Sequence, residues 1–97
     1  MKPSEAFRLH REAIRRIVER NNAANPRIFG SVMRGEDTED SDLDILVDPI
    51  SGKTTLISLV KIKRELEDLL GVTTDVLTPM SLPDRLRQAV IDQAVPV

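Results

Sequence analysis

The sequence predicts an α/β (α+β) protein in which a small, mixed, twisted sheet of about three strands has helices packed on one face. Three segments place apolar side chains at helical spacing, and three short runs between them are rich in aliphatic and β-branched residues. Three short strands cannot bury both faces of a sheet by themselves, so we expect the helices to cover one face. Ninety-seven residues suffice for one hydrophobic core, which predicts a single domain over residues 1–97.

The first element is predicted to be an amphipathic helix from Ser4 to about Asn21. Its apolar residues recur near the helical period, and arginines and glutamates occupy the other positions. Ser4 is a suitable N-cap, and Asn21-Asn22 followed by Pro26 ends the helix. The arginines form either a docking face or an ordinary solvated helix surface.

The middle of the chain is predicted to contain two strands joined by a turn and a loop. Residues 27–29 form a short strand that leads into Gly30-Ser31, and residues 32–34 make one helical turn that Gly35 stops. Residues 36–41 are polar and form an exposed loop. The second strand runs over residues 42–47 and ends before Asp48-Pro49.

The last third is predicted to contain a helix, a strand and a helix. Thr54 or Thr55 caps a long helix that ends at Gly71, and residues 72–77 form the third strand. Ser81 and Asp84 have the spacing of a capping box for a third helix, which Pro96 prevents from continuing.

Composition limits the kinds of ligand. A net charge of −2 and a pI near 5.4 disfavour direct nucleic-acid binding, and only Phe7 and Phe29 are available to stack on bases. There is no cysteine and only one histidine, His10, so a bound metal would be a hard ion held by oxygen. No segment is apolar enough to span a membrane or to act as a signal sequence, so we expect a soluble cytoplasmic protein.

Three aspartates are candidate metal ligands and catalytic residues. In a strand, Asp42 and Asp44 project to the same side, and their repulsion is relieved by a cation or by a proton. Asp75 interrupts the apolar third strand and would complete a trio beside them. Two Mg²⁺ ions held by such a trio can stabilise the attacking and leaving oxygens of a displacement at phosphorus. Asp42 and Asp44 would hold both ions, and Asp75 the ion nearest the nucleophile. Each aspartate taken alone is equally well explained as a solvent-facing strand residue.

Gly30, Ser31 and Arg34 are candidate nucleotide-binding residues. Glycine allows the backbone to approach a phosphate, Ser31 offers a hydroxyl, and the amides of the following turn point at an anion. Arg34, one turn further on, can reach the same phosphates. A Gly-Ser pair alone is most often an ordinary strand-to-helix turn.

Gly52-Lys53-Thr54 resembles the end of a phosphate-binding P-loop, but the required glycine five residues earlier is replaced by Val47. Lys53 is therefore a loop lysine or, at most, a residue that contacts a phosphate or an acceptor.

Gly30-Ser31, the ten residues that follow, Asp42-Leu43-Asp44 and the later Asp75 resemble the nucleotidyltransferase superfamily that includes DNA polymerase beta. Four further features resemble its smallest branch, the minimal nucleotidyltransferase (MNT) proteins. They are Arg34-Gly35, Ser41 before the Asp-Leu-Asp motif, residues 72–79 and the closing Ala94-Val95-Pro96-Val97.

This resemblance implies Mg²⁺-dependent transfer of AMP from ATP, with pyrophosphate leaving. It also implies a partner, a HEPN-domain toxin that the MNT protein neutralises as an antitoxin by adenylylating a tyrosine, in a hetero-oligomer. It assigns Gly30 and Ser31 to the triphosphate, Asp42 and Asp44 to both metal ions, and Asp75 to the ion on the nucleophile side.

Two other functions remain possible besides adenylylation of a toxin. The protein could be a non-catalytic antitoxin that neutralises its partner by occluding its surface. Transfer to a small molecule such as an aminoglycoside is a third possibility, but the chain is too short to enclose one.

Overall fold

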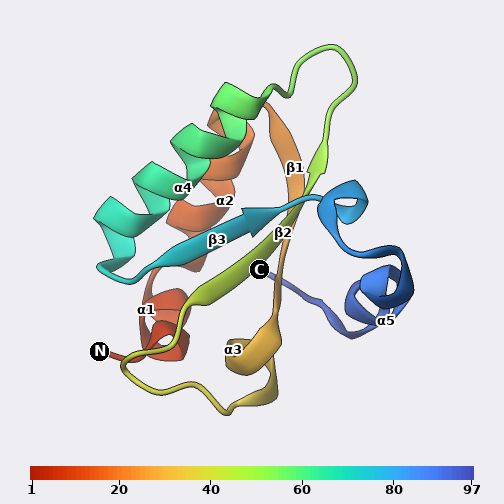
Figure 1. The fold of residues 1–97 in the computed structure, drawn as a ribbon. Coiled ribbons are helices and arrows are strands. Elements are labelled where there is room, and N and C mark those ends of the chain that lie inside the picture. Colours follow the sequence, from red (N-terminus) through yellow and green to blue (C-terminus); the bar gives the residue numbers. More distant parts are fainter.

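The computed structural model describes residues 1–97 and contains one four-stranded sheet in the order β3-β2-β1-β4 (Figure 1). β1 is antiparallel to β2 and β4, whereas β3 runs parallel to β2. The elements are α1 (Pro3–Leu9), α2 (Arg11–Arg20), β1 (Ala23–Phe29), α3 (Gly30–Arg34), β2 (Leu43–Pro49), α4 (Leu56–Leu70), β3 (Thr74–Leu77), the 3₁₀ helix η1 (Pro79–Ser81), α5 (Asp84–Gln93) and β4 (Val95–Pro96). The predicted mixed sheet with helices on one face is therefore confirmed, with a fourth strand added.

The core lies between the sheet and α1, α2 and α4. Side chains from alternate positions of β2, namely Leu43, Ile45 and Val47, are buried there against Ile14 of α2 and Ile62 of α4. Each such aliphatic side chain contributes about 2 kcal/mol by leaving water. The alternation along β2 therefore directs the intervening Asp44 to the opposite face of the sheet.

α4 begins and ends where the sequence predicts. The Thr55 hydroxyl accepts a hydrogen bond from the Ser58 amide at 3.1 Å, which caps the first turn. Gly71 follows the last turn with φ of 69°, a left-handed conformation that glycine adopts without steric cost. The helix is thus fixed at both ends by local signals.

The predicted first helix is two helices. α1 ends at Leu9 and α2 starts at Arg11, with His10 between them at φ of −126° and ψ of 25°. Both segments keep the same amphipathic pattern, so periodicity alone did not reveal the break. The break lets α2 pack on β1 while α1 packs near α3 and α4.

β1 is longer than predicted because it continues through Pro26. The pairing of β1 with β2 shifts register between Ala24 and Arg27, and Asn25 adopts a left-handed φ of 51°. At such an irregularity a proline without an N–H costs little. The strand therefore begins at Ala23 instead of after the proline.

The C-terminal segment differs from its predicted caps. Ser81 belongs to η1, where its hydroxyl donates to the Thr78 carbonyl, and α5 begins at Asp84 without a side-chain cap. The predicted Ser81–Asp84 capping box is therefore wrong, although the helix exists. After α5, Val95 and Pro96 pair with β1 as β4, which the sequence analysis did not predict.

None of the helices is both long and apolar enough to cross a lipid bilayer.

Candidate active site

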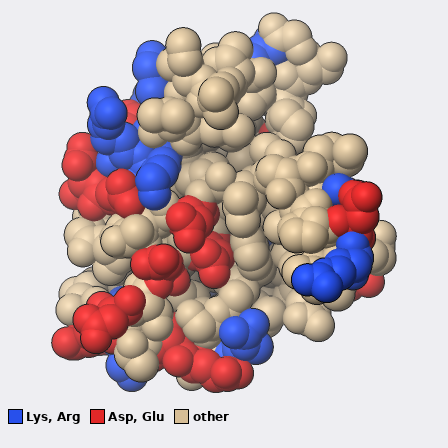
Figure 2. All heavy atoms as spheres, viewed as in Figure 1, with Lys and Arg blue, Asp and Glu red and all other residues tan.

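The three candidate aspartates lie at one end of the open face of the sheet. Phe29, Asp44 and Asp75 pair in register across β1, β2 and β3, so they form one row perpendicular to the strands. Asp42 precedes β2 by one residue, and the charges of Asp42 and Asp75 both act on Asp44. Figure 2 shows acidic side chains gathered over the middle of this face. The structure therefore places the predicted trio in one region of this face, but not close enough to hold an ion as the side chains stand.

The electrostatic cost of this arrangement is concentrated on Asp44. Partial burial, followed by the charges of Asp75 and Asp42 and a hydrogen bond with Asp75, raises the pKa of Asp44 from 3.8 to about 6. The nearby Arg34 guanidinium acts in the opposite direction but does not cancel these effects. A cation or a proton between the carboxylates would relieve the repulsion.

Gly30 is required by both its conformation and its neighbour. Its φ is 75°, and a Cβ at this position would lie 2.3 Å from Oδ2 of Asp44. No side chain fits there unless Asp44 moves, because real Cβ contacts are longer. The backbone at the start of α3 therefore reaches directly to the central carboxylate.

Ser31 and Arg34 lie on α3, which follows β1 without an intervening loop. Arg34 is half exposed and its Nε contacts Oε1 of Glu36 at 3.2 Å, while its charge lowers the pKa of Asp44. An exposed arginine with one weak surface partner can be redirected to a phosphate at little cost. Gly30, Ser31 and Arg34 thus line the β1 side of the carboxylate row.

Lys63 is a polar neighbour of the site that sequence reasoning missed. Its Nζ donates to the Thr74 carbonyl at 2.6 Å, lies 3.3 Å from Oε2 of Glu67 and is 3.9 Å from Oδ1 of Asp75. Glu67 in turn accepts the Thr74 amide at 3.1 Å. These contacts join α4 to β3 beside Asp75. The available signal was a lysine four residues after Leu59, next to the apolar stripe of α4.

Asp37 was predicted to lie in an exposed loop, but it is only 7% exposed. Its Oδ2 accepts the Ser4 amide at 2.9 Å, which joins the loop before β2 to the first turn of α1. Burial raises the pKa of Asp37, but hydrogen bonds from Ser4 and the charge of Lys2 outweigh it and place the pKa below its usual value. No pattern distinguished this aspartate from its acidic neighbours in the loop.

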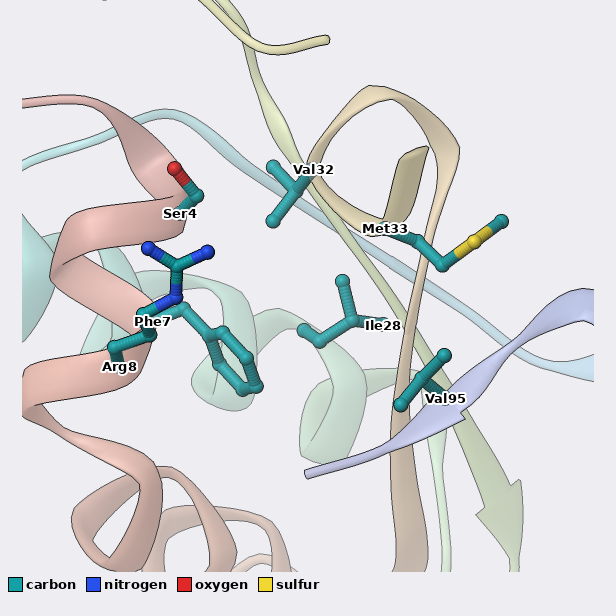
Figure 3. A pocket seen from close by; sticks show the side chains of 7 residues that line it. All are labelled: Ser4, Phe7, Arg8, Ile28, Val32, Met33 and Val95. Carbon is teal, nitrogen blue, oxygen red and sulfur yellow. The ribbon is translucent and has the colours of Figure 1, made fainter. Parts of the chain in front are cut away.

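Two other features lie away from the row. Lys53 follows the C-terminal end of β2, whereas Asp44 is at the opposite end. A pocket of about 170 Å³ opens between α1, β1, α3 and β4, where the Phe7 ring points toward Ile28 (Figure 3). Ile28 belongs to the core on the helix-covered face, so this pocket is separate from the carboxylates.

The donor set fits a hard divalent cation chemically. All three candidate ligands are carboxylates, which Mg²⁺ and Ca²⁺ prefer, and after burial the charges of Asp75 and Asp42 raise the pKa of Asp44. No three acidic, histidine or cysteine side chains are gathered closely enough to hold an ion as they stand. Binding would therefore require the side chains to close together around the ion.

A mixed sheet with a Gly-Ser turn against an Asp-x-Asp strand, and a third carboxylate on the adjacent parallel strand, defines a nucleotidyltransferase. Comparison with known proteins agrees: residues 10–97 match the profile described as "Nucleotidyltransferase domain", and the chain belongs to this family.

Its relatives place it among the small members of the family. It is 42% identical over 81 residues to a Methanocaldococcus jannaschii protein named "Putative protein adenylyltransferase MJ0435", covering 84% of this chain and 86% of the other. It is 35% identical over 86 residues to the protein adenylyltransferase MntA of Thermococcus cleftensis, covering 89% and 83%. A solved minimal nucleotidyltransferase superposes with a TM-score of 0.86 at 44% identity, over 97% of this chain and 95% of that chain. The chain is thus an enzyme of the MNT type.

More distant structures share the fold alone. A chain from a toxin–antitoxin complex with AMP-PNP gives a TM-score of 0.73 at 23% identity, over 88% of this chain and 69% of that chain. A chain from the complex of a tri-AMPylated Shewanella oneidensis HEPN toxin with an MNT antitoxin gives 0.67 at 21% identity, over 92% and 69%.

Proposed function

We propose that this protein is an antitoxin that transfers AMP from ATP to a tyrosine hydroxyl of a HEPN-domain toxin. The observation that carries the proposal is the row of Asp44 and Asp75 across two strands, with the Gly30 backbone against Asp44. The names of the relatives add the class of reaction, and the toxin–antitoxin structures with the same fold add the kind of partner.

In the proposed reaction, the acceptor oxygen forms a bond to the α-phosphorus of ATP. The bond from this phosphorus to the oxygen that bridges the α- and β-phosphates breaks, and pyrophosphate leaves with that oxygen. The hydroxyl proton passes to a carboxylate oxygen of Asp75, which is half exposed and therefore accessible to an acceptor. Product AMP remains bound to the acceptor through a phosphodiester.

In this reaction one group of residues would bind the triphosphate, and the three aspartates would hold the metal ions. Gly30 and Ser31 would bind the triphosphate through backbone amides and the hydroxyl, and Arg34 would contact its charged oxygens. Asp42, Asp44 and Asp75 would hold two Mg²⁺ ions, which supply charge neutralisation at the phosphate and at the attacking and leaving oxygens.

Intact-mass analysis tests this proposal. The chain is incubated with ATP, Mg²⁺ and the product of the adjacent gene, which the proposal expects to be a HEPN-domain protein. The expected product is that partner with one or more added AMP units. The variant Asp42→Ala with Asp44→Ala should give no added mass, because it removes the ligands shared by both proposed ions.

The same variant distinguishes catalysis from occlusion. If it binds the partner as the wild-type protein does but no longer neutralises it, transfer carries the antitoxin activity. Equal neutralisation by the double variant, at matched folding and expression, would instead show that occupying the partner's surface is sufficient.

A further inference from the structure

We infer that the acceptor protein docks on an apolar groove between the N-terminal half of α4, β3 and η1, through apolar side chains flanked by acidic ones. This inference rests on the proposed function and specifies how its partner reaches the site. The groove, called the α4–β3 groove below, has a volume of about 250 Å³ and is lined mainly by Leu56, Leu59, Val60, Lys63, Val76 and Leu77.

The geometry of the proposed displacement indicates that the acceptor approaches from the β3 edge of the sheet. Across the sheet, Asp75 on β3, Asp44 on β2 and Gly30 after β1 lie in that order. In a displacement at phosphorus the attacking and leaving oxygens are roughly in line. Because the triphosphate is assigned to Gly30, the acceptor must approach from beyond Asp75, which is the β3 edge.

The α4–β3 groove is contiguous with that edge. Lys63 lines the groove and also lies 3.9 Å from Asp75, and Val76 lines the groove as the residue after Asp75. An apolar segment seated in the groove would therefore place a neighbouring hydroxyl next to the proposed proton acceptor. The pocket of Figure 3 lacks this property, since it lies at the opposite edge of the sheet, beside β4.

Apolar side chains are unusually exposed around the groove. Leu56 and Met80 are each 78% exposed, Ile57 is 67% exposed and Val60 is 48% exposed. Leu56 and Val60 line the groove, whereas Ile57 and Met80 are next to lining residues in the sequence. Single exposed apolar residues are ordinary, but several on one helix and its neighbouring segment are typical of a protein interface. The groove holds one or two anchoring side chains, and the exposed residues around it supply the surrounding contact area.

Charge indicates which partner fits. Lys61 and Arg64 follow Val60 on α4, are exposed and form no ion pair within the chain. They lie on the side of α4 toward α2, where Glu65 and Asp68 also lie, and not in the groove itself. Figure 2 shows basic and acidic side chains together to one side of the acidic cluster over the sheet. An acceptor segment that extends acidic residues past Val60 would therefore meet Lys61 and Arg64, and would be repelled by the carboxylates further across the face.

The test compares two matched double variants. Leu56→Asn with Val60→Asn removes apolar contacts from the groove, and Leu9→Asn with Val95→Asn makes the same change at residues that are 66% and 48% exposed elsewhere. Each is titrated calorimetrically with the HEPN-domain protein without nucleotide, and separately with MgATP alone. Circular dichroism and melting temperature verify that both fold.

The groove variant should bind the HEPN-domain protein at least tenfold more weakly, with MgATP binding unchanged, whereas the control should bind both as the wild-type protein does. Wild-type affinity in the groove variant overturns the inference, and so does a loss of affinity in the control alone. Failure of the wild-type protein to bind this partner overturns both the docking site and the proposed function.

Two further outcomes separate the competing explanations. If the wild-type protein binds the partner but transfers no AMP, the proposed function fails while the docking site is still judged by affinity. If sedimentation shows that the groove variant only abolishes self-association of the chain, the occupant is a second copy and the inference is overturned.

The contribution of Lys61 and Arg64 is tested separately, through the rate of association with the partner. Lys61→Glu with Arg64→Glu should slow association with the partner about tenfold and reverse the dependence of the rate on salt, because exposed charges act mainly on encounter. An unchanged association rate would show that the flanking charge of the partner is not acidic.

Discussion

At the scale of single residues, Asp44 is the carboxylate most affected by repulsion within the candidate site. Its pKa is raised to about 6 because it is partly buried and faces the charges of Asp75 and Asp42. An aspartate whose pKa is raised in the folded state stabilises the fold fully only below its unfolded pKa, near 4. This contribution is lost as the pH rises through 6, so the metal-free protein is penalised at neutral pH.

We therefore expect Asp44→Asn to raise the stability of the metal-free protein at pH 7.5 by about 1–3 kcal/mol, or several degrees in melting temperature. At pH 4 the difference should largely disappear, because Asp44 is then protonated in the folded protein. Thermal melts in a chelating buffer at the two pH values provide the measurement.

Asp68→Asn is a suitable control for the loss of one negative charge, since Asp68 is exposed on α4 beside Arg20 and Asn21. Added Mg²⁺ should raise the melting temperature of the wild-type protein and of this control, but not that of Asp44→Asn. A stabilisation by Asp44→Asn that is equal at both pH values would contradict the electrostatic explanation.

The sequence predicts those candidate site residues whose spacing is itself informative. Asp42, Asp44 and Asp75 were detectable because carboxylates in strand-like segments are unfavourable without a reason, and Gly30 because it leads into a turn. Lys63 and Asp37 were not detectable, because their importance depends on tertiary contacts: a helix passing the edge of β3, and a loop folding back on α1.

At the scale of elements, the loop between α3 and β2 is held by Asp37. Its carboxylate accepts the Ser4 amide at the start of α1, where a negative charge is also favoured by the helix dipole. Since this loop leads directly into Asp42 and β2, the contact fixes the approach of the chain to the carboxylate row.

Asp37→Asn should destabilise the fold by about 1 kcal/mol at neutral pH, because the charged acceptor is replaced by a neutral one. The lowered pKa of Asp37 means that the wild-type protein keeps this contribution above the unfolded pKa and loses it as the pH falls through the folded pKa. Chemical denaturation at pH 7 and at pH 3 should therefore show the variant's deficit shrinking in acid. Asp40→Asn, in the exposed part of the same loop, should leave the stability unchanged.

Elements with strong local signals were predictable, and elements defined by packing were not. Thr55 and Gly71 marked the ends of α4 because capping is a local interaction. The break at His10 and the extension of β1 through Pro26 depend on what each segment packs against. β4 is only two residues long and exists because β1 offers it an edge, which no local pattern records.

At the scale of the whole molecule, the two faces of the sheet differ: one forms the hydrophobic core, and the other bears the candidate active site. Helices α1, α2 and α4 bury one face of the sheet, and the other face is left to carry the carboxylate row. The proposed nucleotide site lies near Gly30, beside the carboxylate row, and the proposed acceptor arrives from the β3 edge.

Labelled ATP offers the most direct measurement of whether this centre transfers AMP to a protein. With ATP labelled at the α-phosphate, the account predicts label on a tyrosine of the HEPN-domain partner, dependent on Mg²⁺ and lost in Asp75→Asn. With ATP labelled at the γ-phosphate, the label should appear only in released pyrophosphate. Label from the γ-phosphate on the partner, or neutralisation of the partner without any label, would contradict the account.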